Sequence, residues 1–291
     1  MKVFVPTELK KLYRPASDTN GEDNGSITII GGSDLFHGAP LFALKTASRI
    51  VDMVFFSSPE PSVGKVAENI KSELLSFIWV PWEEVDQYIK KSDAVLIGPG
   101  FKRFNSESTP HGDRIHNCDE ECQKTREITK SFLDKFPNKK WVIDAGSLQT
   151  MDAKWIPKKA VITPNKKEYQ LLFGDKMLDV SSETGNEIIG SIAKKHDFTI
   201  VLKGPETLVV SPDEAVLVKG GNPGLTKGGT GDVLAGLTVA LLAKNDPFLA
   251  ASSASYIEKK AADELYEKVG VNYNADDLVD QIPVTFCTLV K

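Results

Sequence analysis

Residues 228–242 read GGTGDVLAGLTVALL, a glycine-rich turn that runs directly into an apolar helix. Apolar residues lie on every side of this helix, a pattern typical of a helix that is buried in the interior of a protein. The N-terminus of the helix, at Gly231 and Asp232, therefore occupies a fixed position in the fold. The rest of the chain shows what surrounds that position.

Short apolar runs recur from Ser26 onward, and each ends in Gly, Pro, Asn or Asp before a helical pattern begins. This alternation predicts an α/β fold with a mostly parallel central sheet and helices on both faces. Two later runs, Leu208–Ser211 and Ala215–Lys219, flank a turn at Pro212 and predict an antiparallel hairpin at one edge of the sheet. The predicted parallel strands are Ser26–Ile30, Met53–Ser57, Ser76–Val80, Ala94–Ile97, Trp141–Asp144, Ala160–Thr163 and Thr199–Lys203.

Composition limits the classes of function. The chain has 291 residues, of which 41% are apolar and 26% charged, and its net charge is -5. At this length one α/β domain buries roughly 75% of the surface of its unfolded chain, and we expect a single domain over residues 1–291. The acidic balance argues against nucleic acid as a partner. The longest apolar run, Val233–Ala243, is far shorter than the about 20 residues of a membrane span, and residues 1–11 lack the apolar core of a secretory signal.

The cysteines and one polar segment bear on location and metal binding. The cysteines are Cys118, Cys122 and Cys287. So sparse and odd a set argues against a disulfide framework and favours a reducing, cytoplasmic location. Residues 102–123 are polar and lack periodicity, which predicts a surface insertion. This insertion holds His111 and His116 beside two of the cysteines, but their spacing matches no standard zinc site and favours a solvated loop.

The glycine-rich turn predicts a site for an anion. Several backbone N–H groups can point at one spot there, and the helix dipole adds partial positive charge, which suits a phosphoryl group. We call Gly229, Thr230 and Gly231 the anion hole. The neighbouring Asp232 either caps the helix or takes a proton from an attacking hydroxyl while the anion hole holds the transferred phosphate. The adjacent anion hole favours the catalytic interpretation.

The ends of the predicted strands indicate a ligand site at one edge of the sheet. Ligands of open parallel sheets bind beyond the carboxyl ends of the strands. In this chain those ends are small, polar or charged: 31–33 (GGS), 98–100 (GPG), 144–146 (DAG), 163–165 (TPN) and 203–204 (KG). Any one of them could be a tight turn alone, but together they favour a binding edge. Neither a Walker A loop nor a GxGxxG motif after a strand is present.

The segment 228–232 resembles the anion-hole motif of the ribokinase-like superfamily, in which the aspartate is the catalytic base. An ordered set of motifs over about residues 20 to 270 is similar to the signature of NAD(P)H-hydrate dehydratases. The motifs are 24–33 (NGSITIIGGS), 37–40 (HGAP), 98–100 (GPG), 142–145 (VIDA), 163–168 (TPNKKE), 202–204 (LKG) and 221–236. The resemblance implies a three-layer ribokinase-like sandwich. It also implies an enzyme that returns the S-epimer of hydrated NADH or NADPH to the intact cofactor, by phosphorylating the ring hydroxyl and eliminating phosphate.

The resemblance implies a role for individual residues. Asp232 would be the catalytic base and would also touch the substrate. The hydrated-dinucleotide site would be lined by Ala39, Gly100 and Asn165. The nucleotide would lie along Lys203, Gly204, Pro205, Glu206, Thr207 and Gly231. Glu168 would organise Mg²⁺ through water, because Asn165 and Glu168 have the N-x-x-E form of ribokinase-like kinases; the alternative is a capped helix start with Glu at the third position.

The resemblance also implies partners: ADP or ATP as co-substrate, Mg²⁺ as cofactor, assembly into a tetramer, and a separate protein for the epimerase activity that is fused in many relatives. Asn165 and Gly146 depart from the family pattern, where prokaryotic dehydratases carry His and Asp. The missing His and the N-x-x-E form leave a second hypothesis open, a small-molecule alcohol kinase of the thiazole or pyrimidine type. A non-catalytic nucleotide-binding protein is the least favoured hypothesis, because the segment 228–232 is intact.

Overall fold

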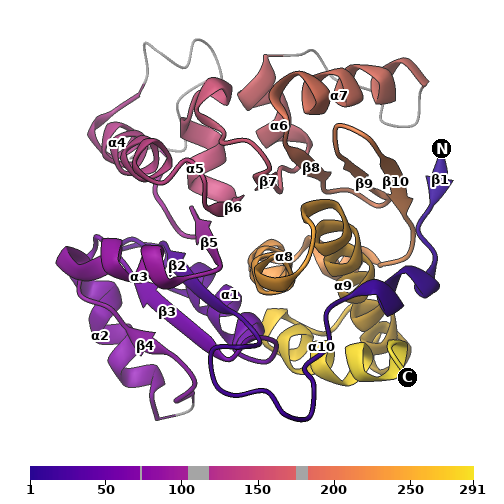
Figure 1. Cartoon of the computed structure of the whole chain (residues 1–291), viewed down its shortest axis with the longest axis horizontal. Coiled ribbons are helices and arrows are strands. Elements are labelled where there is room, and N and C mark those ends of the chain that lie inside the picture. The colour runs from indigo at the N-terminus through magenta and orange to yellow at the C-terminus, as the bar shows by residue number, and fades with distance from the viewer. Residues whose placement is uncertain (73, 104–117, 175–182) are drawn as a thin grey trace.

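The computed structural model describes residues 1–72, 74–103, 118–174 and 183–291, and helices cover both faces of its sheet (Figure 1). The strands are β1 (Lys2–Val3), β2 (Ser26–Ile30), β3 (Met53–Ser57), β4 (Ile78–Trp79), β5 (Ala94–Ile97), β6 (Lys140–Ile143), β7 (Val161–Ile162), β8 (Thr199–Leu202), β9 (Thr207–Val210) and β10 (Ala215–Val218). The helices are α1 (Gly38–Ala47), α2 (Pro61–Ile70), α3 (Val85–Lys91), α4 (Glu120–Lys135), α5 (Ala145–Thr150), α6 (Lys166–Phe173), α7 (Glu183–His196), α8 (Thr230–Lys244), α9 (Pro247–Val269) and α10 (Ala275–Leu289).

The strands form one sheet in the order β1-β10-β9-β8-β7-β6-β5-β2-β3-β4. All neighbouring strands pair in parallel except β9, which is antiparallel to both β8 and β10. The predicted α/β fold, the parallel sheet and the hairpin are therefore confirmed. The hairpin does not form the edge, however, because β1 pairs outside β10. β1 has only two residues and lies before the repeating pattern that begins at Ser26, which is why the sequence did not indicate it.

The direction of winding reverses between β2 and β5. These two strands are parallel neighbours, with Ile27 opposite Ala94, and the later strands extend from them toward opposite edges. A reversal of this kind opens a crevice at the carboxyl ends of the two strands. Gly32 follows β2, and its N–H donates to the carbonyl of Pro99, which follows β5, at 2.8 Å. A methyl group on Gly31 would lie 2.2 Å from the same carbonyl oxygen, so only glycine allows the two strand ends to approach this closely.

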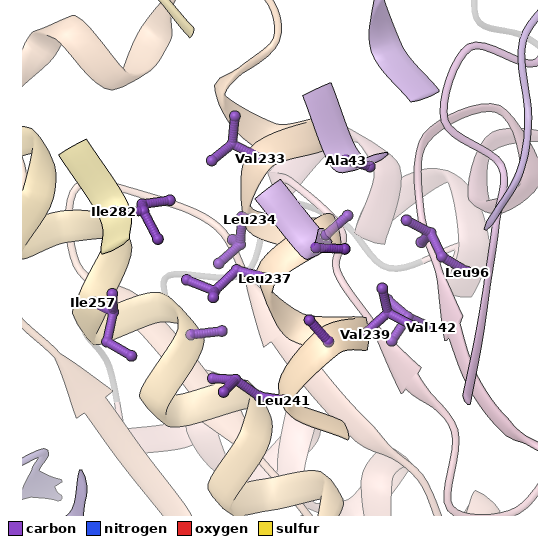
Figure 2. Packing of buried hydrophobic residues seen from close by; sticks show 14 of the residues in the cluster. Ala43, Leu96, Val142, Val233, Leu234, Leu237, Val239, Leu241, Ile257 and Ile282 are labelled. Carbon is purple, nitrogen blue, oxygen red and sulfur yellow. The ribbon is translucent and has the colours of Figure 1, made fainter. Parts of the chain in front are cut away.

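Helix α8 lies at the centre of the layer that covers one face of the sheet. Figure 2 shows its side chains in contact with both the sheet and the neighbouring helices: Val239 lies by Leu96 of β5 and Val142 of β6, and Leu241 lies on the side of Ile257 in α9. Helices α1, α2, α9 and α10 contribute to the same apolar cluster, whereas α3 to α7 pack against the opposite face. The prediction that this helix is buried is therefore confirmed.

Two expectations about residues 102–123 need correction. Helix α4 begins at Glu120, and the Asp119 carboxylate caps it by accepting the N–H of Cys122 at 3.0 Å, so the end of the expected insertion is helical. Cys118 and Cys122 form a disulfide, although the cysteine set argued against disulfides. The bond joins residues one helical turn apart, so it ties no distant elements together. His111 and His116 lie outside the described residues.

No helix within the described ranges is both long enough and apolar enough to cross a membrane.

Candidate active site

The residue that precedes α8 and caps its N-terminus is Gly229, which adopts a left-handed backbone conformation with φ of 94°. A methyl group there would lie 2.6 Å from the ring of Phe42 and 2.8 Å from Cβ of Ala275. Both the conformation and the close packing therefore require glycine. Because Gly229 is the cap residue, Asp232 is the third residue of the helix and does not cap it, contrary to the alternative interpretation.

The residues of the predicted anion hole differ in how free they are to bind. The hydroxyl of Thr230 donates to the carbonyls of Leu225 at 2.8 Å and Lys227 at 2.9 Å, and its N–H contacts the Lys227 carbonyl at 3.4 Å. Thr230 therefore mainly fixes the preceding turn. Gly231 is the second residue of α8. The N–H groups of the first helical turn have no earlier helical carbonyl to bond, so Gly231 fits the anion-hole role best.

A lysine links the anion hole to two carboxylates. The ammonium of Lys203 lies 3.0 Å from Asp144 Oδ1 and 3.8 Å from Glu168 Oε2. A methyl group on Gly231 would lie 3.4 Å from the same ammonium. Lys203 directly follows β8, and its N–H donates to the Pro164 carbonyl at 2.9 Å, which joins the ends of β7 and β8. Four segments distant in the sequence thus meet at one point.

Charges at this point alter the ionisation of the proposed base. Burial, together with the Asp144 and Glu168 carboxylates, outweighs the attraction of Lys203 and raises the pKa of Asp232 to about 7. Burial alone would lower the pKa of Lys203, but Asp144 and Glu168 more than offset this effect and raise it above its ordinary value. Lys203 is therefore a permanent cation near neutral pH, whereas Asp232 can hold or release a proton, as a general base requires.

Glu168 has a structural role that the sequence left as an alternative. Its Oε2 accepts the N–H of Asn165 at 2.8 Å, and Asn165 Oδ1 accepts the N–H of Glu168 at 3.0 Å, which is a complete capping box. Its Oε1 accepts a hydrogen bond from Gln149 Nε2 at 2.7 Å. Both oxygens of this buried carboxylate thus already accept hydrogen bonds. The carboxylate can interact with a cation through a bridging water, but it does not present an unengaged oxygen for direct coordination.

A cavity of about 480 Å³ opens beside Lys203 and Gly231. It is lined by Lys203, Gly204, Pro205, Thr207, Gly221, Asn222, Pro223, Leu225, Thr226, Thr230, Gly231, Leu234, Glu258 and Lys259. All residues predicted to bind the nucleotide therefore line this one cavity, except Glu206. The side chain of Glu206 is half exposed and lies 3.5 Å from the Lys219 ammonium at the surface.

The sequence interpretation missed two carboxylates as site residues, Asp144 and Glu258. Asp144 directly follows β6 and precedes Ala145, whose positive φ of 47° is rare for a residue with a side chain; such backbone conformations are often found at functional sites. Glu258 is buried on α9, where burial raises its pKa to about 8 against the opposing charges of Lys259 and Lys203. A signal was present: Glu258 shares a helix face with Ala254, Ala261 and Leu265, all of which are buried.

Two of the three predicted substrate residues, Ala39 and Gly100, lie near the crevice between β2 and β5, whereas Asn165 follows β7. Ala39 lies in the first turn of α1, next to Pro40, and a methyl group on Gly100 would lie 3.0 Å from the Pro40 ring. A methyl group on Gly98 would lie 2.0 Å from the Asp144 carbonyl oxygen, so the crevice adjoins the cluster around Lys203. Asn165 is exposed at the N-terminus of α6. The cavity itself is lined by none of Ala39, Gly100 and Asn165, and their shared role stays a prediction.

The departure at Gly146 has a packing reason. A methyl group there would lie 2.3 Å from the carbonyl oxygen of Phe101, and a backbone atom cannot move aside by changing a rotamer. An Asp at this position would require the two loops to separate. The chain thus accommodates only glycine where the family pattern has a second Asp.

The acidic side chains of the site determine how it could bind a metal ion. In the described part of the chain no three His, Cys, Asp or Glu side chains converge closely enough to hold a metal ion by themselves. Asp144 and Glu168 nevertheless lie within 4 Å of the Lys203 ammonium, at 3.0 and 3.8 Å, and both carboxylates raise the pKa of Asp232. Such a surplus of carboxylates fits a hydrated Mg²⁺ that is also bound by phosphates, because this ion keeps several waters.

The architecture is that of the ribokinase-like class. The chain is similar to a ribokinase-like superfamily protein from Enterococcus faecalis, with a TM-score of 0.81 and 21% identity over 99% of this chain and 96% of the other. It is also similar to the ADP/ATP-dependent NAD(P)H-hydrate dehydratase of Bacillus subtilis that was co-crystallized with ATP/Mg²⁺, with a TM-score of 0.78 and 22% identity over 99% and 98% of the two chains.

Residues 27–284 match the NAD(P)H-hydrate dehydratase family, and the chain belongs to this family. It is 31% identical to a bifunctional NAD(P)H-hydrate repair enzyme of Hyperthermus butylicus, over 97% of this chain and 52% of that protein. It is 30% identical to the ADP-dependent (S)-NAD(P)H-hydrate dehydratase of Nitrosopumilus maritimus, over 97% and 93% of the two chains. The chain thus spans about half the length of the bifunctional relatives and nearly the full length of the dehydratase.

Proposed function

We propose that the protein dehydrates the S-epimer of hydrated NADH or NADPH and thereby repairs the damaged cofactor, with ADP or ATP as co-substrate. The observation that carries the proposal is the position of Asp232, a carboxylate with a pKa raised to about 7 in the first turn of α8, beside the cluster around Lys203. Membership of the NAD(P)H-hydrate dehydratase family supports the choice of substrate.

The proposed reaction has two steps. The ring hydroxyl attacks the terminal phosphoryl group of the nucleotide while Asp232 takes the hydroxyl proton and Gly231 binds the phosphoryl oxygens. The bridging P–O bond breaks, and the nucleotide leaves one phosphate shorter. In the second step the phosphate leaves the ring carbon with the C–O bond electrons, water takes a proton from the adjacent carbon, and the electrons of that C–H bond form the double bond of the dihydronicotinamide. Lys203 stays charged throughout and stabilises the negative charge of the transferred group.

The cavity beside Lys203 is the proposed nucleotide site. Its volume of about 480 Å³ lies within the range of about 300–1,000 Å³ that is usual for small-molecule pockets. Mg²⁺, when bound with the nucleotide, neutralises phosphate charge and orients the terminal phosphoryl group. Asp144 and Glu168 are the residues proposed to hold it through water, and Ala39, Gly100 and Asn165 are proposed to bind the dinucleotide.

The test is a repair assay with hydrated NADH, Mg²⁺ and either ADP or ATP. We expect recovery of the near-ultraviolet absorbance of the reduced nicotinamide, with release of one phosphate for each cofactor restored. Parallel reactions with the two nucleotides identify the donor. Absence of recovery with both nucleotides contradicts the proposal, and a stable phosphorylated alcohol in place of free phosphate indicates the kinase alternative. The match of residues 27–284 to the NAD(P)H-hydrate dehydratase family favours the dehydratase over the kinase alternative.

The remaining expectations stay predictions. Assembly into a tetramer is measured by sedimentation of the full chain, and a separate epimerase is indicated if only the S-epimer is consumed. A cytoplasmic location agrees with the small number of cysteines, but the Cys118–Cys122 disulfide counts against it, because disulfides are rare in reducing compartments. Fractionation of cells that express the chain tests whether the protein is in the cytoplasm or in an oxidising compartment.

A further inference from the structure

One lysine outside the proposed reaction centre contacts both sides of the cavity. Lys259 lies on α9, and its side chain is buried. Its ammonium donates to three backbone carbonyls, those of Gly204 at 3.2 Å, Pro205 at 2.8 Å and Gly220 at 3.0 Å. Each of these bonds has a charged donor, and such hydrogen bonds are stronger than those between neutral groups.

The three carbonyls belong to two separate walls of the cavity. Gly204 and Pro205 form the loop between β8 and β9, which we call wall one, and residues 220–226 form the segment before α8, which we call wall two. Both walls contribute residues to the lining. The β9–β10 pairing ends at Thr207 and Val218, and beyond it wall two continues into a short 3-10 helix, Pro223–Thr226. A bridging cation can fix the separation of the two walls across the cavity.

Wall two is also fastened to α9 at other points. The Asp263 carboxylate accepts the N–H of Gly221 at 3.2 Å, and Asn222 Nδ2 donates to the carbonyl of Ala262 at 2.9 Å. Gly221 has a φ of +80°, and a methyl group on it would lie 3.1 Å from Cγ of Lys259. Helix α9 is thus the support for wall two, and Lys259 extends that support to wall one.

A second contact between the two sides is weaker. Lys219 lies 3.5 Å from Glu206, and both side chains are more than half exposed. Water and salt screen exposed pairs of this kind, so they contribute little. Lys259 is by contrast desolvated, which lowers its pKa, while Glu258, Asp263 and Glu206 act in the opposite direction. Its carbonyl partners replace the lost water.

We propose that Lys259 is a positioning residue for the nucleotide: by joining the two walls it holds the cavity in the shape that binds ADP or ATP. The inference rests on the proposed function only in assigning a nucleotide to this cavity. If the cavity forms in a fraction of molecules, the apparent dissociation constant rises by the inverse of that fraction. Loss of Lys259 therefore weakens nucleotide binding, while the chemistry at Asp232 is unchanged once the nucleotide is bound.

The test compares Lys259→Met with the wild type by calorimetric titration of ADP and ATP in the presence of Mg²⁺. We expect Kd to rise about tenfold, as it does when about one tenth of the molecules are competent to bind. In the repair assay KM for the nucleotide should rise by a similar factor, with kcat and KM for hydrated NADH within about twofold of the wild type. Lys260→Met is the matched control, because Lys260 is the next residue on α9 and makes none of the three bonds to the walls.

The outcomes separate a positioning role from a purely structural one. If Lys259 only stabilises the fold, Lys259→Met loses melting temperature and active fraction but keeps the nucleotide Kd, and the proposal is overturned. If the Met variant does not fold, Lys259→Gln replaces it: its side chain is polar but too short to reach the three carbonyls, so we expect the same rise in nucleotide Kd. Lys259→Arg keeps the charge and should restore part of the nucleotide affinity. A wild type that binds nucleotide tightly yet repairs no hydrate contradicts the proposed function and leaves this inference standing.

Discussion

The proposed base should give the repair reaction a pH dependence that the structure specifies. Only the ionised form of Asp232 can take the hydroxyl proton, so the rate should rise with pH through its pKa of about 7. Asp232 is then about one tenth ionised at pH 6 and about nine tenths ionised at pH 8, and kcat/KM should rise about tenfold between them, since kcat/KM follows the free enzyme. We would measure it as initial repair rates at low hydrate concentration in buffers of constant ionic strength.

Asp144→Asn perturbs this pKa without touching the base. Removing the Asp144 carboxylate removes one of the charges that raise the pKa of Asp232, and it leaves the Lys203 ammonium to interact with Asp232 instead. The midpoint of the profile should therefore move below pH 7, even if the maximal rate falls. We expect burial to keep the midpoint above the ordinary value of 3.8, because burial is the largest cause of the shift.

Glu258 is the group most able to imitate this profile, because its pKa is raised to about 8 within the cavity. Glu258→Gln separates the two carboxylates: the limb near pH 7 should persist in this variant if Asp232 is responsible. A limb near pH 8 that disappears in Glu258→Gln refutes the assignment to Asp232. A rate that is constant from pH 6 to pH 8 in the wild type refutes it as well.

Three further substitutions have specified outcomes. Asp232→Asn should keep nucleotide binding in calorimetry but lower kcat by orders of magnitude, and wild-type turnover would refute the base assignment. The same variant should flatten stability against pH: because the folded pKa of Asp232 is raised from 3.8 to about 7, its contribution is complete below about pH 4 and is lost as pH rises through 7, which thermal unfolding from pH 4 to 8 measures. Gly236→Ala should lower the free energy of unfolding by about 1–3 kcal/mol, because the new methyl group would lie 2.4 Å from the Ala43 carbonyl oxygen; urea unfolding that matches the wild type would contradict this. Lys140→Met should cost about 1.5–3 kcal/mol in the same assay, because Lys140 Nζ bonds three carbonyls at the C-terminus of α8, at 3.1, 3.2 and 3.3 Å; an unchanged midpoint would show that water satisfies those carbonyls equally well.

The sequence was most informative where a local pattern has one physical solution. Runs such as Ala94–Ile97 are apolar at every position and short, and they end in Gly or Pro, which together favour a strand buried on both faces; the strand forms at those residues. The glycines near α8 were equally clear, because Gly229 needs both a positive φ and close packing. Features without a pattern were missed, such as β1, which lies before the first predicted strand and pairs with β10 for only two residues.

Contacts between distant residues could not be predicted in the same way. Asp144, Lys203 and Asp232 follow or begin three different elements, and no spacing along the chain relates them. The rule that strand ends meet at one edge places them on the same side of the sheet, but it does not show that Lys203 approaches Asp144 within 3.0 Å. That distance depends on how β7 and β8 pair, and the pairing alone brings the Lys203 side chain to this point.

The segment Asn165 to Glu168 shows how a helix cap can also fix the position of a candidate ligand carboxylate. The sequence presented a capped helix start and a cation-organising carboxylate as alternatives. In the structure the capping box is formed, and the hydrogen bond from the Asn165 N–H holds Glu168 Oε2 at 3.8 Å from the Lys203 ammonium. A long side chain loses rotamer freedom when it is fixed in a charged site, and here the cap and Gln149 have already removed that freedom. The cap is therefore the means by which the carboxylate is positioned, so the observed capping box does not compete with the proposed role of Glu168 toward Mg²⁺, which stays a prediction.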